Sequence, residues 1–237
     1  MEEEKIKREA EEKIYLMGKF ELAERNDFVL IPTYRATNGS SMYLRREAYK
    51  AFQAMATAAE KDGIKLKIAS ATRNFDYQKT IWEAKWSGAT LVNGKNLSQS
   101  TPDGTARFTK ILEYSAAPGT SRHHWGTDID INAATPEHFE TEKGKKEYEW
   151  LVINAGMFGF CQPYNLKDSF RPTGYNEEKW HWSYLPLARN FTEEYKTLIT
   201  ESDLTGPAKD GVNFLGAEFA PQDLITDYVL GINPECL

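Results

Sequence analysis

Apolar side chains that recur every three or four residues predict a chain built mainly of helices. Such spacing places the apolar residues on one face of a helix, which can then pack against a core. The clearest case lies between the Ser40–Ser41 cap region and Gly63. A further helix is expected through Ile81, Trp82 and Trp86. This clearest helix covers residues 44–59, and the remaining expected helices cover residues 3–17, 145–155, 192–200 and 222–229.

Strict alternation of apolar and polar residues predicts a few short strands between these helices. Residues 87–120 instead are rich in Gly, Ser, Thr, Asn and Pro, so we expect a long loop, which in a compact domain is often functional. Helices that surround a few strands without regular βαβ alternation predict an α+β fold. The expected strands are residues 64–70, 127–132, 158–161 and 180–184.

The composition is that of a globular domain, and the net charge argues against some classes of binding partner. The 237 residues are 41% hydrophobic and 27% charged, as in ordinary globular proteins. The net charge of -6 gives no general attraction to nucleic acid or anionic lipid. No apolar run is long enough to span a membrane, and the N-terminal MEEEKIKREAEEK lacks the apolar core of a secretory signal. No feature indicates an oligomeric state.

Cys161 and Cys236 are the only cysteines. Two residues are too few for a disulfide framework, and their spacing is not that of a C-x-x-C metal motif. Either one disulfide or two free thiols agrees with the sequence, so the redox compartment stays open.

The stretch S-R-H-H-W-G-T-D-I-D-I-N at residues 121–132 holds the first candidate chemistry. His123 and Asp130 are separated by seven residues across a bend at Gly126, and His181 lies at the start of a later strand. Two imidazoles and one carboxylate would leave the fourth position of a tetrahedral Zn²⁺ open for water, as in catalytic zinc sites. The alternative is that these residues are hydrogen-bonded structural side chains.

Hydrolysis at such a site also needs a base and a group that stabilises the oxyanion. Glu178 precedes His181 by three residues and is the candidate base, with Glu177 as its competitor. Arg73, just past a strand end, is the candidate oxyanion partner. Their ordinary alternatives are a solvated acid and a surface ion pair.

Three motifs together resemble a known family. The 121–130 string and E-K-W-H at 178–181 resemble the S-x-H-x-x-G-x-A-x-D and E-x-W-H motifs of zinc D-alanyl-D-alanine carboxypeptidases of the VanY type. This family belongs to a wider group with lysostaphin-type peptidases and the Hedgehog signalling domain. The earlier S-A-T-R-N-F-D-Y-Q at 70–78 is similar to the family's S-x-x-R-x-x-x-x-Q segment.

The resemblance implies a site and a fold. It implies a small central antiparallel sheet, flanked by helices, that holds the metal. Residues 1–30 would then be a helical extension, and residues 31–237 the peptidase domain, with a motif core at about 40–190 and a helical tail. The family's roles fall on His123, Asp130 and His181 as zinc ligands, Glu178 as base, Arg73 as transition-state arginine, and Ser121 and Gln78 as cleft residues. His124 has no ligand counterpart.

Asp128 departs from the family pattern, which usually has alanine there. Strand alternation places Asp128 on the same face as Asp130. It would orient a ligand, contact a substrate amine or face solvent. Among the aromatic residues inside the motifs, Trp125 and Trp180 are the candidates to wall the cleft.

The leading hypothesis is a zinc carboxypeptidase that removes a terminal D-amino acid from peptidoglycan stem peptides. Arg107 and Arg122 are candidate partners for the free carboxylate of such a substrate. The alternatives are an L,D-carboxypeptidase, an endopeptidase on wall peptides, or a non-catalytic zinc domain that binds peptide. A location in the cell envelope, periplasmic or extracellular, follows from this substrate alone.

Overall fold

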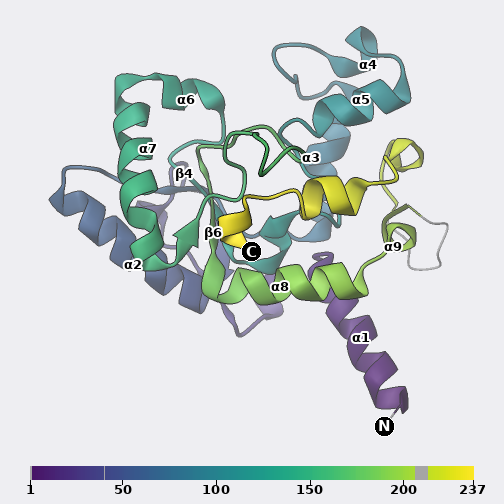
Figure 1. Cartoon of the computed structure of the whole chain (residues 1–237), viewed down its shortest axis with the longest axis horizontal. Helices are drawn as coiled ribbons and strands as arrows, with labels where there is room; N and C mark the ends of the chain where they lie inside the picture. The colour runs from purple at the N-terminus through teal and green to yellow at the C-terminus, as the bar shows by residue number, and fades with distance from the viewer. Residues whose placement is uncertain (1, 40, 206–212) are drawn as a thin grey trace.

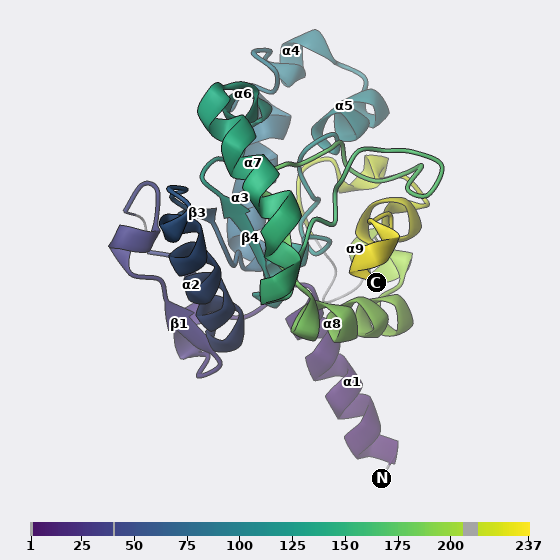
Figure 2. The ribbon, with the colours of Figure 1, turned by 60° about the vertical axis from the view of Figure 1, so that its left-hand side comes forward.

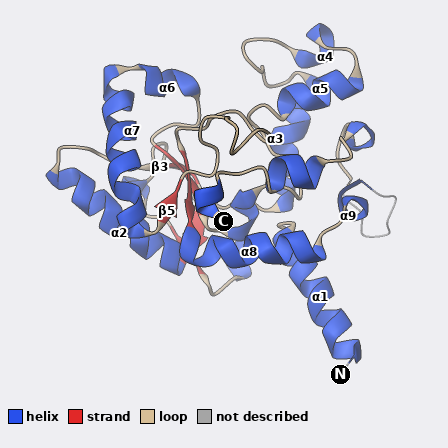
Figure 3. Cartoon of the chain, in the orientation of Figure 1, coloured by secondary structure: helices blue, strands red, loops and turns tan. Residues whose placement is uncertain are grey.

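The centre of the molecule is a four-stranded antiparallel sheet surrounded by helices, which confirms the α+β prediction (Figure 1). The structure is a computed structural model that describes residues 2–39, 41–205 and 213–237. The strands lie in the order β3-β4-β6-β5 and are coloured red in Figure 3. They are β3 (Ile68–Ser70), β4 (Asp128–Ile131), β5 (Phe160–Cys161) and β6 (His181–Tyr184).

The two faces of the central strands have opposite character. Ile129, Ile131 and Trp182 alternate with polar residues and belong to an apolar core shared with α2 (Arg46–Lys61) and α7 (Glu142–Asn154). Figure 2 shows these two helices on the same side of the molecule. The opposite face of β4 and β6 carries side chains that are polar yet buried. Since a strand turns successive residues to opposite faces, one short strand serves both a core and a site.

A second core fills the other half of the molecule. Trp82, Phe108 and Trp125 are fully buried in it, together with residues of the C-terminal segment. It lies among α1 (Glu2–Leu16), α3 (Phe75–Ser87), α5 (Gly104–Ile111) and α8 (Leu185–Leu198). Trp125 therefore belongs to the core and does not wall the cleft, contrary to prediction.

Several predicted boundaries are wrong for identifiable reasons. The segment 87–120 is no continuous loop, because it contains α4 (Leu97–Ser100) and α5, whose Phe108 anchors it in the second core. The helix expected from residue 44 begins at Arg46, since β2 (Tyr43–Arg45) pairs with β1 (Phe28–Leu30). The strand expected from residue 64 forms only from Ile68. Ser40 of the expected cap lies outside the described residues.

The last helices also differ from expectation. The helix expected at 192–200 begins earlier, at Leu185, and the one expected at 222–229 is a π-helical turn at Leu224–Val229. Short helices α6 (Pro136–Glu140) and α9 (Glu201–Thr205) were not expected. In the described parts of the chain, none of the helices has the length and apolar character needed to cross a membrane.

The N-terminal residues are tied to the domain. The Tyr15 hydroxyl donates a hydrogen bond to the carbonyl of Trp125, 2.7 Å away, and Leu16 is fully buried. Beyond α1, strand β1 pairs with β2 across the expected boundary at residue 30. The outer turns of α1 extend away from the body of the molecule, as Figures 1 and 2 show.

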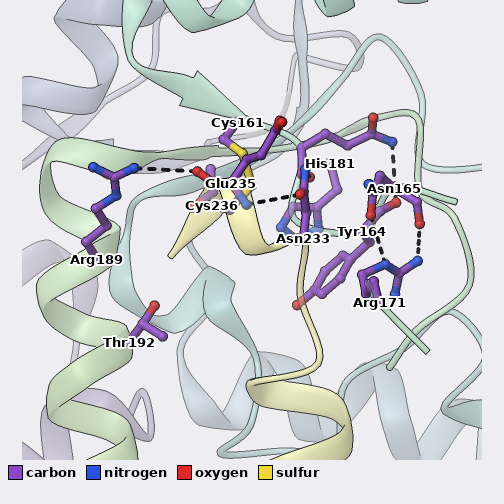
Figure 4. The surroundings of a disulfide bond; sticks show 12 residues. Cys161, Tyr164, Asn165, Arg171, His181, Arg189, Thr192, Asn233, Glu235 and Cys236 are labelled. Atoms are coloured by element: carbon purple, nitrogen blue, oxygen red, sulfur yellow. Dashed lines mark hydrogen bonds between the residues drawn. A yellow bond between two sulfur atoms is a disulfide. The ribbon is translucent and has the colours of Figure 1, made fainter. Parts of the chain in front are cut away.

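A disulfide joins Cys161 in β5 to Cys236 near the C-terminus, which resolves the choice that the sequence left open (Figure 4). The two Cα atoms are 5.7 Å apart, a normal spacing for a disulfide. Next to it, Asn233 donates from its backbone N–H to the carbonyl of Pro163 and from its side chain to that of Gln162. The C-terminal residues are thus fixed to the segment that follows β5.

We expect loss of this disulfide to destabilise the domain. The two cysteines are 75 residues apart in the sequence. A crosslink that closes a loop of this size lowers the entropy of the unfolded chain and so stabilises the fold by about 2–4 kcal/mol. Cys161→Ser and Cys236→Ser should each lower the free energy of unfolding by that amount in urea titrations. The double variant should lose no more than either single variant, because only one crosslink is removed. Unchanged unfolding midpoints would contradict this expectation.

Candidate metal centre

Pairing of β4 with β6 brings two of the predicted ligands together. Asp130 lies directly opposite His181 in the antiparallel register, and Asp128 lies opposite Ser183. Because both pairs occupy the same face, the four side chains form one buried polar surface. Asp130 is 3% exposed and His181 4% exposed, so both candidate ligands are buried.

The third predicted ligand, His123, comes from the turn before β4. Ser121 begins this 3₁₀ turn (Arg122–Trp125) by accepting a hydrogen bond from the backbone N–H of His123. Gly126 ends the turn at φ 73°, a conformation that favours glycine. The Nδ1 atom of His123 lies 2.8 Å from the carbonyl oxygen of Ala71, so it carries the proton and leaves Nε2 as a free electron-pair donor.

The three side chains fit a metal ion. Their ligand atoms all lie within 4.8 Å of one another. His123 Nε2 and Asp130 Oδ1 are buried without a hydrogen-bond partner, although they are 3.4 Å apart. Buried polar atoms without partners are costly, and a cation between them would remove that cost. Two nitrogens and one carboxylate oxygen are donors that Zn²⁺ prefers, with a fourth position left open.

Asp128 fixes the orientation of His181. Its Oδ2 lies 2.8 Å from His181 Nε2, which turns Nδ1 toward Asp130 Oδ1 at 3.6 Å. Both Asp128 oxygens are engaged, since Thr127 and Ser183 donate to Oδ1 and Arg122 donates to Oδ2. Fully buried Asp128 does not face solvent. This geometry favours a role in orienting the ligand over a contact with a substrate amine.

Burial and charge set the protonation of the cluster. Burial, reinforced by Arg73, lowers the pKa of His123, which keeps the imidazole neutral as a ligand must be. Burial opposes ionisation of Asp130, but His123 and His181 hold the pKa of that carboxyl below its usual value. Although burial acts against it, hydrogen bonds to Asp128 and Glu178 raise the pKa of His181 to about 9. A metal ion held by His181 would therefore have to displace a proton.

Glu178 lies beside the cluster, as predicted. Its Oε2 is 3.1 Å from His181 Nδ1, and its side chain lines the same cleft as the three ligands. Burial raises the pKa of Glu178, as suits a group that takes up and returns a proton. The competing Glu177 lies outside this cleft, where it lines a neighbouring hollow and contacts the Tyr148 hydroxyl at 3.4 Å.

Arg73 reaches the same cleft from the end of β3. Its backbone N–H donates to the carbonyl of His123, and its buried Nε has no hydrogen-bond partner. His124, which had no predicted role, fixes this segment from the other side. The His124 Nδ1 atom lies 2.7 Å from the Arg73 carbonyl oxygen, and its Nε2 accepts from the Gly119 N–H. Burial lowers the pKa of His124 to about 3, so it remains neutral.

The predicted substrate residues divide into two groups. Ser121, Gln78 and Trp180 line the cleft. Gln78 donates to the Ala116 carbonyl and leaves its own buried Oε1 without a partner. Asp128 lies behind His181 and does not line the cleft.

The two arginines proposed for the substrate carboxylate are both engaged elsewhere. Arg107 does not line the cleft, and its guanidinium donates to four backbone carbonyls near α4, including that of Thr101. Arg122 is 1% exposed, and its nitrogens are held by Asp128, Ser183 and Thr192. Neither guanidinium is free to meet a substrate.

Lys85, Tyr164 and Tyr175 are among the cleft residues that the sequence did not predict. Lys85 lies seven residues after Gln78 on α3, and this two-turn spacing would have placed it on the same helical face. Tyr164 packs edge-on against His181 with ring centroids 4.7 Å apart, and Tyr175 packs against Tyr164. The two tyrosines lie in a turn-rich segment without periodicity, which offered no signal.

These features define a class. An α+β domain with imidazole and carboxylate donors on one buried wall, and with Glu178 and Arg73 in the same cleft, has the architecture of a zinc metallopeptidase. A family model described as VanY, D-alanyl-D-alanine carboxypeptidase, matches residues 41–187. The chain belongs to this family.

Individual proteins that are similar to the chain are also described as carboxypeptidases. A D-alanyl-D-alanine carboxypeptidase of Enterococcus faecalis is 30% identical over 151 residues, which are 64% of this chain and 51% of that protein. The chain spans about half the length of this relative and of another from Bacillus subtilis.

Two solved structures share the fold. One is a mutant of the vancomycin resistance D,D-pentapeptidase VanY in complex with Zn(II), with a TM-score of 0.51 and 25% identity, covering 74% of this chain and 87% of that one. The LdcB LD-carboxypeptidase has a TM-score of 0.52 and 24% identity, covering 77% and 81%.

We expect Asp128→Asn to weaken zinc binding about 10–100-fold, as loss of a partner behind a ligand typically does. The amide keeps the shape of the side chain but no longer offers the anionic Oδ2 that His181 and Arg122 share. Competition with a chromophoric chelator measures the affinity. Asp62→Asn is the matched control, because Asp62 accepts from Trp150 away from the site. Unaltered zinc affinity in Asp128→Asn would contradict the orienting role.

Proposed function

We propose that the chain is a zinc carboxypeptidase that hydrolyses the terminal D-Ala-D-Ala bond of peptidoglycan stem peptides. The observation that carries the proposal is the buried His123, Asp130 and His181 cluster with unpaired donor atoms beside a buried carboxylate. Family membership supports the choice of substrate class.

His123, Asp130 and His181 would hold the zinc, which when bound lowers the pKa of water and polarises a carbonyl. Glu178 would take the proton of the attacking water and return it to the leaving amine. Its raised pKa and its position at the cleft wall support this dual use.

Arg73 would stabilise the oxyanion that forms on the scissile carbonyl. Its cation lies in the same cleft, its Nε lacks a protein partner, and its main chain is fixed by His123 and His124. A donor that is positioned before the reaction needs little reorganisation when charge develops.

Trp180 and Tyr114 would wall the cleft against the peptide. Their rings lie 6.1 Å apart, and both residues line this cleft and the neighbouring hollow. Tyr114 belongs to the segment that returns from α5, so residues 87–120 contribute one wall. This wall supports selection of substrates that end in the cleft.

The cell envelope is the proposed location, because the substrate lies there. The Cys161–Cys236 disulfide supports an oxidising compartment.

The substrate assignment is tested with the zinc-loaded protein and purified stem peptides. We expect the pentapeptide to lose one D-alanine, as read from product masses. Cleavage of the tetrapeptide alone would indicate an L,D-carboxypeptidase, and cleavage within cross-linked stems an endopeptidase. If none of these peptides is cleaved, the proposed activity is wrong and a non-catalytic zinc domain is favoured.

Glu178→Gln should reduce kcat by about 10²–10⁴-fold, because the amide cannot accept the proton of water. Zinc content should stay at the native value when measured by atomic absorption. Glu177→Gln is the matched control, since this neighbour lies outside the cleft and should retain native kcat. Native turnover by Glu178→Gln would exclude Glu178 as the base.

A further inference from the structure

Lys85 projects from α3 into the cleft of the metal centre. Its ammonium nitrogen donates a hydrogen bond to the hydroxyl of Ser115, which is 8% exposed on the opposite segment. Both residues line the cleft together with Arg73 and Glu178. Lysine side chains normally extend their ammonium group into water, so a lysine that points into a cleft is unusual and suggests a role there.

This ammonium group has no anionic partner of its own. Within residues 2–39, 41–205 and 213–237, neither Lys85 nor Arg73 forms a salt bridge within 4.0 Å of a carboxylate. Burial, and then repulsion from Arg73, lowers the pKa of Lys85. Glu178 offsets this only in part. Lys85 and Arg73 are thus two neighbouring cations without a carboxylate partner, and they favour an additional negative charge beside them.

A carboxypeptidase must recognise the free carboxylate at the end of its substrate. Arg122 and Arg107 are engaged by the protein, as described above, and Arg73 lies next to the reacting centre. Of the basic residues that line the cleft in the described chain, Lys85 is therefore the one left for this task.

We propose that Lys85 and Ser115 form the subsite that binds the C-terminal carboxylate of the substrate. Lys85 supplies the charge, and Ser115, which already accepts a hydrogen bond from it, supplies a hydroxyl donor to the second oxygen. This inference rests on the proposed function, because it names how that activity selects chain ends.

The subsite explains selectivity as well as affinity. A peptide whose C-terminus is amidated brings no negative charge, so its binding leaves the Lys85 ammonium more deeply buried and still unpaired. This desolvation cost lowers the affinity for the amidated peptide, whereas a charge-assisted hydrogen bond to Lys85 raises the affinity for the free acid. Lys85 would thereby discriminate between chain ends and internal bonds.

Binding measurements test this subsite apart from turnover. In a Glu178→Gln background loaded with zinc, calorimetry compares D-alanyl-D-alanine with its C-terminal amide. We expect the free acid to bind about 10–100-fold more tightly, the range of one charge-assisted hydrogen bond. Adding Lys85→Met, which keeps the length of the side chain, should reduce this ratio to about one. Lys85→Arg should restore most of the preference.

Lys79→Met on the same helix is the matched control, because Lys79 pairs with Glu83 and does not line the cleft. It should leave the preference for the acid unchanged. Equal affinities for acid and amide in the parent, no measurable binding of the acid, or a preference that survives Lys85→Met would each overturn the subsite. Absence of hydrolysis by the native protein, with the Lys85-dependent preference intact, would instead overturn the proposed activity alone.

Discussion

The antiparallel pairing of β4 with β6 is the contact on which the site depends. It places Asp130 opposite His181 and Asp128 opposite Ser183, so that two cross-strand pairs build one polar wall. The alternate residues of the same strands, among them Ile129 and Trp182, bury themselves against α2 and α7. A shift of the register by one residue would turn the ligands into that apolar core, so the core specifies the register of the metal centre.

A chain of compensated charges lets this wall stay buried. Arg122 and Asp128 are both almost inaccessible, and each would be costly alone. Arg122 pairs with Asp128, and Asp128 in turn hydrogen-bonds to Nε2 of His181. The other ring nitrogen of His181, Nδ1, is thereby directed at Asp130. Within this wall and its turn, the buried atoms without partners, His123 Nε2 and Asp130 Oδ1, lie where a cation would satisfy them.

Segments remote in sequence supply the rest of the cleft. The disulfide holds the C-terminal residues against the segment after β5, and three residues beyond Cys161 that segment places Tyr164 on the ring of His181 (Figure 4). On the other side, α3 contributes Gln78 and Lys85 from one helical face. The metal centre is therefore framed by elements that belong to the second core rather than to the sheet.

Local patterns in the sequence predicted the central strands and several helices, and the family resemblance added the ligand set. Alternation predicted β4 and β6, because strand geometry fixes which neighbours share a face, and the resemblance of the motifs pointed to His123, Asp130 and His181, which the structure brings together. Only tertiary structure decided that Arg122 is occupied by Asp128 while Lys85 is not paired, and that the cysteines are joined. Those outcomes depend on contacts between segments that no local period connects, such as the 30 residues between Lys85 and Ser115. The sequence therefore predicts the reacting centre, and packing decides which charges remain available around it.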